Sequence, residues 1–260
     1  MNRSASLSRT ILAPLLLGVL VIVLWQLAVV VLEIKPFVLP SPSSIAAQFS
    51  GSIATVWSAS LVTGSNAVIG LLLGAVVGIV AAIVATVLPL TDELSAPLVA
   101  AASVIPIVAL APVLYTMFGA DKETARQLVA ALAVFIPVYL NTLRGLRQAR
   151  PVHRDLMRAY GASGWQATRA VTLPGAVPFL FIGLRIASSL AVISALIGEY
   201  FGGPIGGLGK SITSAAASSN YSLAYAYVLG AIILGLVFYV VTLGVERLVS
   251  PHRADVRGAA

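Results

Sequence analysis

The sequence predicts an all-α membrane protein with about six transmembrane helices, and three observations support this. Of its 260 residues, 59% are hydrophobic and only 10% are charged, whereas a soluble domain carries about 25% charged residues on its wetted surface. The charges are separated by apolar runs near the roughly 20 residues that cross a bilayer. Most basic residues fall on one side of the resulting helices. This composition excludes a water-soluble enzyme or binding module, and its hydrophobicity excludes a disordered chain.

The predicted spans are the gaps between charged residues. No charged residue lies between Arg9 and Glu33. This run is longer than the core of a secretory signal, so we expect an uncleaved first helix. Residues 36–51 contain several prolines and serines and are interpreted as a loop. The six predicted spans cover residues 10–32, 61–88, 96–118, 125–143, 179–200 and 221–245.

The distribution of basic residues predicts the orientation of these helices. With the N-terminus inside, eleven Lys and Arg residues lie on the cytoplasmic side, six of them in segment 144–178 and three in the C-terminal tail. The tail residues are Arg247, Arg253 and Arg257, and the four residues on the outer side are Lys35, Lys122, Arg126 and Lys210. This excess predicts two cytoplasmic termini and an even number of spans. It also explains the net charge of +7 without a nucleic-acid partner.

Segment 144–178, between the fourth and fifth spans, is the one long cytoplasmic loop, and it is too long for an idle connector. Its sequence predicts two short helices that meet at a glycine. Gly161 has the backbone freedom to reverse the chain direction between them. Ser163 and Gln166 have the spacing of a capping box at the start of the second helix.

A proline delimits the second helix of this loop. Leu173-Pro174 is predicted to end it, because the residue before a proline is pushed out of helical geometry. The loop is therefore expected to form a helix–turn–helix elbow on the inner membrane face. Its Arg, Tyr and Trp side chains would be presented to a cytoplasmic partner.

At these residues the chain resembles the permease subunits of binding-protein-dependent ABC importers. Their signature reads E-A-A, three residues, G, nine residues, I, one residue and L-P, and the spacing here matches it without a gap. Asp155 is a conservative replacement at the first position, whereas Leu156 and Met157 stand where two small residues are expected. The resemblance implies that contacts to an ATPase subunit are made by Asp155, Leu156, Met157, Gly161, Ala162, Ser163, Leu173 and Pro174.

Three further segments resemble the nitrate, sulfonate and taurine branch of that superfamily. They are LPSPSSI at 39–45, IPIVALAPVLYTMFG at 105–119 and GEYFGGPIGGLG at 198–209. The branch implies a small nutrient as substrate, of the sulfonate, nitrate or vitamin-precursor pyrimidine type. The GEYFGG segment favours the last of these.

The resemblance also implies an architecture and a set of partners. The chain would have a type I ABC importer permease fold as a single transmembrane domain, residues 1–260, in a bacterial-type inner membrane. It would pair with a second permease copy as a homodimer, with two cytoplasmic ATPase subunits and an external substrate-binding protein. ATP and Mg would be used by the ATPase subunits, and no cofactor would be bound by this chain.

Residues 206–211, GGLGKS, look like part of a phosphate-binding loop. That motif requires a first glycine at position 204, which is Pro204. The orientation also places this segment outside, away from ATP. We interpret it as a glycine-rich turn between the fifth and sixth spans.

Glu199 is an ionisable residue near the outer end of the fifth span. A charge in a membrane helix is energetically expensive and commonly faces a cavity or a partner. Our hypothesis is that Glu199 lines the outer gate of a transport pathway. The alternatives are a solvated carboxylate at the membrane interface or an ion pair with Lys210.

Small and polar residues in the spans are assigned to packing. Gly70, Gly74 and Gly78 share one face of the second span, where they allow close helix contact within the subunit or at a dimer seam. Asn66 and Asn141 are expected to form interhelical hydrogen bonds. An interfacial aromatic belt is predicted from Tyr115, Phe118, Tyr200, Phe201 and Tyr221.

Catalysis has no support in the sequence. The two histidines, His153 and His252, have no carboxylate cluster nearby, and the absence of cysteine excludes a disulfide framework or a Cys-built metal site. We therefore expect no metal site. The alternatives are an ion-gradient-driven secondary transporter, which usually has internal repeats and buried ionisable residues, and a membrane enzyme, which needs clustered catalytic residues.

Overall fold

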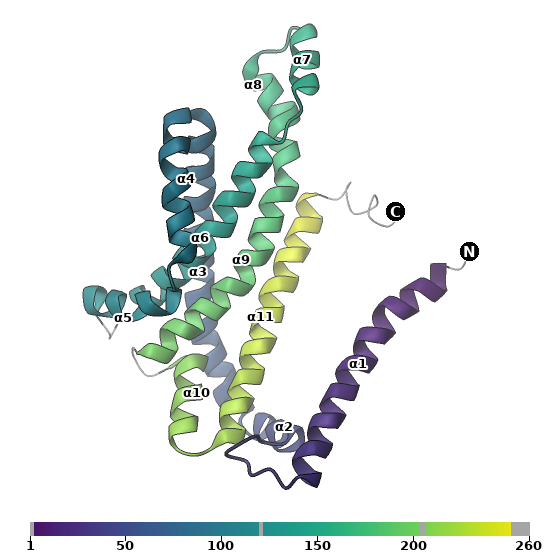
Figure 1. The fold of residues 1–260 in the computed structure, drawn as a ribbon, viewed down its shortest axis with the longest axis vertical. Helices are drawn as coiled ribbons and strands as arrows, with labels where there is room; N and C mark the ends of the chain where they lie inside the picture. Colours follow the sequence, from purple (N-terminus) through teal and green to yellow (C-terminus); the bar gives the residue numbers. More distant parts are fainter. Residues whose placement is uncertain (1–2, 120–121, 203–205, 251–260) are drawn as a thin grey trace.

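The computed structural model describes residues 3–119, 122–202 and 206–250, and helices make up most of this part of the chain (Figure 1). Pro204, His252, Arg253 and Arg257 lie outside these ranges. The helices are α1 (Arg3–Val31), α2 (Pro42–Gly51), α3 (Ile53–Val87), α4 (Pro89–Val104), α5 (Ile107–Phe118), α6 (Thr124–Arg147), α7 (Pro151–Ala159), α8 (Gly164–Ala167), the π-helical turn η1 (Thr168–Thr172), α9 (Leu173–Phe201), α10 (Leu208–Ala217) and α11 (Tyr221–Val249).

Five segments in the described part of the chain are long and apolar enough to cross a membrane. They lie in α1, α3, α6, α11 and the continuous run from α8 to α9, and they confirm five of the six predicted spans. α3, α6 and α11 run toward the end of the bundle that carries α7 and α8, whereas α1 and α9 run away from it, so that the start of α1 and the end of α11 point toward that end (Figure 1).

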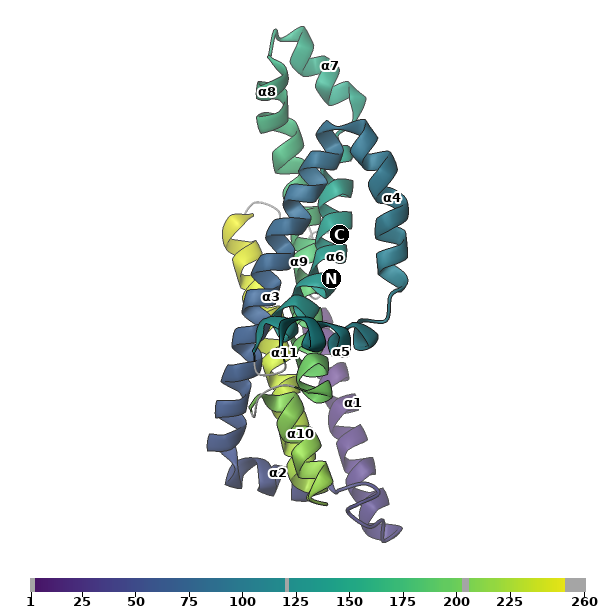
Figure 2. The same ribbon diagram turned by 90° about the vertical axis from the view of Figure 1, so that its left-hand side faces the viewer.

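The third predicted span, residues 96–118, is not one helix, and this prediction was wrong in detail. α4 ends at Val104 and the 12-residue α5 starts at Ile107. Ile105 has extended geometry (φ −65°, ψ 123°), because the ring of Pro106 disfavours the helical region for the preceding residue. α5 consequently lies across the bundle instead of continuing along it, as Figures 1 and 2 show.

Segment 36–51 was predicted as a loop, but its second half forms α2. The Ser41 hydroxyl accepts a hydrogen bond from the Ser44 backbone N–H at 3.3 Å, and Pro42 opens the helix. Proline is well suited to the first helical position because the backbone N–H that it lacks has no intrahelical acceptor there. The prolines and serines that indicated a loop are thus the start signal of a helix.

The core of the bundle is formed by α3, α6 and α9, with α11 packed against α9 and α3 (Figure 1). A buried apolar cluster joins α3, α6 and α9, and its fully buried members are small: Ala67, Val134, Val138, Ala187, Ala191 and Ala195. Small side chains allow close approach of helices, which is how helices associate in lipid.

The glycine face of α3 packs against α6 within the same subunit. A Cβ atom at Gly70 would collide with the Ala130 side chain, and one at Gly74 would collide with the Ala131 carbonyl oxygen. At Gly78 the Phe135 carbonyl oxygen would be only 3.1 Å away. Of the two alternatives for this face, the structure supports packing inside the subunit.

Gly183 of α9 makes an equivalent close contact that sequence analysis missed. A Cβ atom there would lie 2.9 Å from the Pro137 carbonyl oxygen of α6. Gly183 has no glycine three or four residues away, so it does not belong to a recognisable glycine repeat. α6 therefore has glycines of two different helices packed against it.

Candidate functional site: the α7–α8 loop and a buried polar cluster

The first half of the loop is α7, which ends at a glycine as predicted. Gly161 has a φ of +73°, in the left-handed region that favours glycine. Its N–H donates to the Arg158 carbonyl at 2.9 Å, and the Ala162 N–H donates to the Met157 carbonyl at 3.0 Å. These two bonds form a Schellman motif, which satisfies carbonyl groups left free at a helix end. Gly161 thus ends α7 and reverses the chain.

The second half of the loop starts with the predicted capping box. The Ser163 hydroxyl accepts from the Gln166 N–H at 3.3 Å, and the Gln166 side chain accepts from the Ser163 N–H at 2.7 Å. Both halves of the motif are therefore present. Two independent end signals thus hold the α7–α8 turn in one geometry.

The predicted end of the second helix at Leu173-Pro174 is wrong. α8 continues through the π-helical turn η1 directly into α9, so that residues Gly164–Phe201 form one apolar segment. In η1 the Leu173 N–H donates to the Thr168 carbonyl, five residues back. This wider turn admits the ring of Pro174 without a break in the helix. Segment 148–172, which is shorter than 144–178, therefore separates α6 from α9.

The outer face of α7 has an unusual apolar stripe. Val152, Leu156 and Tyr160 follow each other at helical spacing and are 62%, 53% and 80% exposed. Trp165, at the start of α8, is 68% exposed. α7 and α8 lie beyond the end of the bundle (Figure 1). An exposed apolar stripe in such a place is typical of a surface that a protein partner covers.

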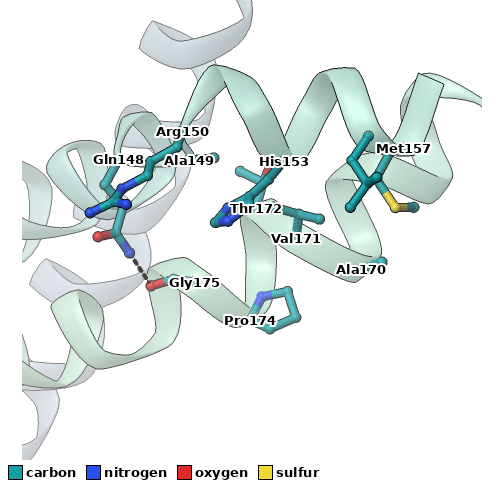
Figure 3. Close-up of a pocket in the computed structure, with 11 residues that line it drawn as sticks. Gln148, Ala149, Arg150, His153, Met157, Ala170, Val171, Thr172, Pro174 and Gly175 are labelled. Atoms are coloured by element: carbon teal, nitrogen blue, oxygen red, sulfur yellow. Dashed lines mark hydrogen bonds between the residues drawn. The ribbon is translucent and has the colours of Figure 1, made fainter. Parts of the chain in front are cut away.

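The inner face of α7 closes over a pocket against η1 and the start of α9. Figure 3 shows Arg150, His153 and Met157 on one side of this pocket and Val171 and Pro174 on the other. The Gln148 side chain donates a hydrogen bond to the Gly175 carbonyl at its base. Both departures from the signature, Leu156 and Met157, line this pocket. Met157 is half-buried, whereas Leu156 is more exposed and also belongs to the stripe.

The predicted coupling residues lie in three places: on α7, in the α7–α8 turn and at the start of α9. Asp155 is exposed and pairs with Arg158 on the same helix at 3.5 Å, a contact that stabilises α7 only slightly. Gly161, Ala162 and Ser163 form the turn. Leu173 and Pro174 lie at the junction of η1 and α9 instead of at a helix end.

A second candidate site surrounds Glu199, near the end of α9 that is farthest from the α7–α8 loop. Glu199 is fully buried, so the alternative of a solvated carboxylate does not apply. Its Oε2 accepts hydrogen bonds from the Thr63 hydroxyl at 2.8 Å and from the Gly209 N–H at 2.9 Å. The Thr63 hydroxyl in turn accepts from the Leu208 N–H at 2.8 Å. The role of Glu199 as a gate residue stays a prediction.

Arg126 and Tyr115 belong to this cluster, and sequence analysis missed both. Arg126 was counted among the basic residues on the outer side, at the start of the fourth predicted span, but it is fully buried in the first turn of α6. Tyr115 was assigned to the aromatic belt, but it is 7% exposed. The Arg126 Nε donates to the Tyr115 hydroxyl at 3.3 Å, and that hydroxyl donates to the Gly198 carbonyl at 2.8 Å. The remaining belt residues are partly or well exposed.

The two asparagines differ in their partners. Asn66 of α3 accepts from the Gln127 side chain of α6 at 3.1 Å, which confirms an interhelical hydrogen bond. Asn141 instead donates from its side-chain amide to the Pro137 carbonyl of its own helix at 2.8 Å. Within the described residues, no group of three or more His, Cys, Asp or Glu side chains is placed to hold a metal ion.

Comparison with known families decides the identity of this architecture. Residues 74–255 match the family described as "Binding-protein-dependent transport system inner membrane component". The chain belongs to this family. The resemblance seen in the α7–α8 loop is thereby confirmed, and the protein is a multi-pass inner membrane permease. Family membership implies a membrane, an ATPase and a substrate-binding protein as its partners.

Several characterised permeases are similar over most of their length. The riboflavin transport system permease protein of Chloroflexus aurantiacus is 38% identical over 88% of this chain and 85% of its own. The formylaminopyrimidine transport permease protein of Halalkalibacterium halodurans is 29% identical over 74% and 76%. The taurine transport system permease protein of Escherichia coli is 26% identical over 93% and 89%.

The fold of the permease also matches a solved structure. A chain of an amino acid ABC transporter, crystallised with histidines, superposes with a TM-score of 0.60 at 16% identity, over 79% of this chain and 96% of that one. This match confirms the expected ABC importer permease fold. Nothing in these comparisons supports an ion-gradient-driven secondary transporter.

Proposed function

We propose that this permease forms the translocation pathway of an ATP-driven importer and that the α7–α8 loop is the docking surface for its ATPase subunits. The observation that carries this proposal is the exposed stripe of Val152, Leu156 and Tyr160. It lies on a helix whose end is set by the glycine of the family signature. ATP hydrolysis would take place in the ATPase subunits, and this chain would transmit its consequences.

The basic residues around the stripe suggest the chemistry of the partner groove. Arg154 and Arg158 are exposed on α7, and Arg169 is exposed in η1. An apolar groove with an acidic rim would complement this surface, since apolar burial supplies affinity and complementary charges orient the partner.

The uninterrupted helix from Gly164 to Phe201 supplies a route for transmission. Because Pro174 does not end it, a displacement of the docked loop would move α9 as one body, including its far end at Glu199. A helix is stiff along its axis, whereas a flexible linker at Pro174 would absorb the displacement. This continuity supports the assignment of the loop as a coupling element within a single permease domain, residues 1–260.

Replacement of Leu156 by glutamate is expected to abolish stable docking of the ATPase. Leu156 lies in the middle of the exposed stripe, and a buried charge without a partner typically costs several kcal/mol, so we expect at least a roughly tenfold loss of ATPase recovered with the permease. The measurement is co-purification of the tagged permease with the ATPase subunit of the same organism.

Leu248→Glu is the matched control for this change. Leu248 is 83% exposed in the last turn of α11, away from the loop, so the same substitution there should leave co-purification intact. Equal recovery of the ATPase with Leu156→Glu and with the unmodified permease would contradict the docking assignment.

We further propose a homodimer with both termini in the cytoplasm. The start of α1 and the end of α11 both point toward the end of the bundle that carries the α7–α8 loop (Figure 1). If the loop meets a cytoplasmic ATPase, both termini lie on that side, in agreement with the excess of basic residues. Protease accessibility of terminal tags in inside-out vesicles tests this orientation.

For the substrate, we propose a small heteroaromatic vitamin or vitamin precursor. The similarity to a riboflavin permease and to a formylaminopyrimidine permease supports this class, in keeping with the GEYFGG segment. The test is uptake by cells that co-express the permease with its ATPase and binding protein. Riboflavin and formylaminopyrimidine are expected to be accumulated and taurine is not; accumulation of taurine alone would contradict the proposed class.

A further inference from the structure

The cluster around Glu199 joins five helices through a few polar side chains. Its residues are Thr63 of α3, Tyr115 of α5, Arg126 of α6, Gly198 and Glu199 of α9, and Leu208 and Gly209 of α10. Both ionisable members, Arg126 and Glu199, are fully buried. Burial of two charged groups is tolerated in a membrane bundle only when they are paired and hydrogen-bonded.

One arm of the cluster caps α10. Leu208 and Gly209 are the first two residues of that ten-residue helix, and their N–H groups have no acceptor within the helix. The Thr63 hydroxyl accepts from the first and the Glu199 carboxylate from the second. A Cβ atom at Gly207 would collide with this carboxylate. The glycine-rich turn that resembles a phosphate-binding loop therefore places the N-terminus of α10 against the Glu199 carboxylate. A helix N-terminus attracts anions in the same way when it binds a phosphate.

The other arm holds α5. Tyr115 lies with Ala111 in a small buried cluster against Ala125 and Val129 of α6. Its hydroxyl is the described polar link from α5 to the rest of the bundle: it accepts from Arg126 and donates to Gly198. At the other end of α5, the chain is broken at Ile105-Pro106. Much of the remaining surface of α5 is exposed, including Met117 at 68%.

We propose that Arg126 is a positioning residue that links both arms of the cluster. It compensates the charge of Glu199, which caps α10, and it holds Tyr115 in place. The Tyr115 hydroxyl in turn keeps closed a lid that is formed by α5 and hinged at Pro106. Arg126 packs against Gly198, the residue before Glu199: a Cβ atom there would lie 3.4 Å from the Arg126 Cα and 3.5 Å from its Cγ. The guanidinium therefore belongs to the electrostatic surroundings of the Glu199 carboxylate.

α10 has two backbone hydrogen bonds to side chains of other helices, Thr63 of α3 and Glu199 of α9, whereas the described polar link of α5 is the Tyr115 hydroxyl. The α5 arm is therefore the part that opens. This inference rests on the proposed function, in which the permease forms the translocation pathway.

The test is the mobility of a spin label on α5. The chain has no cysteine, so Met117→Cys supplies a single labelling site on the full-length permease in lipid nanodiscs. Tyr115→Phe keeps the ring and removes both hydrogen bonds. We expect it to raise the mobile fraction of the label at least about twofold, since loss of hydrogen bonds worth roughly 1 kcal/mol each shifts such an equilibrium several-fold. An unchanged spectrum would overturn the proposal.

Two controls separate the lid from general loosening. A label at Leu236→Cys on α11, 58% exposed, should report no change when Tyr115→Phe is introduced. Tyr200→Phe, at a 55% exposed tyrosine of α9, should leave the α5 label unchanged. Mobility that rises equally at both label positions would overturn the proposal. Because this readout needs neither ATPase nor binding protein, its failure is distinct from failure of the docking experiment with Leu156→Glu.

The charge compensation has its own test. Arg126→Met should reduce the yield of monodisperse permease at least fivefold, because it leaves the Glu199 carboxylate buried without its counter-charge. Adding Glu199→Gln should restore most of that yield, since the amide can still accept from Gly209 without a charge. A double variant that is as poor as Arg126→Met would overturn the role of Arg126 as counter-charge.

Discussion

Replacement of Gly161 by proline is expected to abolish transport-coupled ATPase activity while the membrane helices still insert. The φ of Gly161 is +73°, and proline is restricted to about −65°. Proline also lacks the N–H that bonds the Arg158 carbonyl. It disfavours helical geometry at the preceding residue, and Tyr160 has a ψ of 7°. The turn must therefore rearrange, and the stripe on α7 would no longer be held in register with α8.

The loss can be bounded from the backbone alone. Strain at a disfavoured φ costs about 1–3 kcal/mol, which corresponds to a fall of roughly 5- to 150-fold in the docked population. The rearranged turn adds the lost Schellman bonds to this cost. The measurement is substrate-stimulated ATPase activity and uptake by the reconstituted importer, with the amount of permease in the membrane as reference.

Gly164→Pro is the matched control, because it introduces the same residue three positions further on. Gly164 is the first residue of α8, where proline is tolerated. The preceding Ser163 is already extended, with φ −66° and ψ 160°, and no atom lies within 4 Å of a Cβ at Gly164. This variant should keep coupled activity. Full coupling in Gly161→Pro as well would show that the turn geometry does not matter.

Replacement of Gly74 by leucine is expected to prevent formation of the stable bundle. Its Cβ would collide with the Ala131 carbonyl oxygen and lie 2.8 Å from the Val134 Cβ. Overpacking in a core costs typically about 1–3 kcal/mol when side chains are able to move. Here a backbone atom of α6 stands in the way, so α3 and α6 must separate. The change should lower the thermal midpoint or abolish folded protein, measured by fluorescence-detected size exclusion after heating.

Gly235→Leu is the control for Gly74→Leu. Gly235 lies in the membrane helix α11 with no atom within 4 Å of a Cβ, so leucine there should face open space and leave the thermal midpoint nearly unchanged. A similar loss in both variants would indicate a general effect of leucine in a membrane helix. A normal thermal midpoint for Gly74→Leu would contradict the α3–α6 packing.

Local signals in the sequence determined the α7–α8 loop. The Schellman motif at Gly161 and the capping box of Ser163 and Gln166 are formed by residues within five positions of each other. Such contacts depend on the local chain alone, which is why the sequence predicted the reversal at Gly161 and the capping box. Five membrane segments followed equally from hydropathy, because lipid admits only segments that satisfy their own backbone.

Only the tertiary structure decided what the prolines and the buried charges do. The helix ends before Pro106, whereas at Pro174 it continues because a π-helical turn precedes the proline. The two prolines look alike in the sequence, and packing selects between the two outcomes. Arg126 and Glu199 are 73 positions apart, and each by itself resembles a charge at a membrane surface. Their common burial with Tyr115 arises from the crossing of α5, α6 and α9. Long-range electrostatic compensation of this kind leaves no pattern along the chain, because it is a property of the folded bundle.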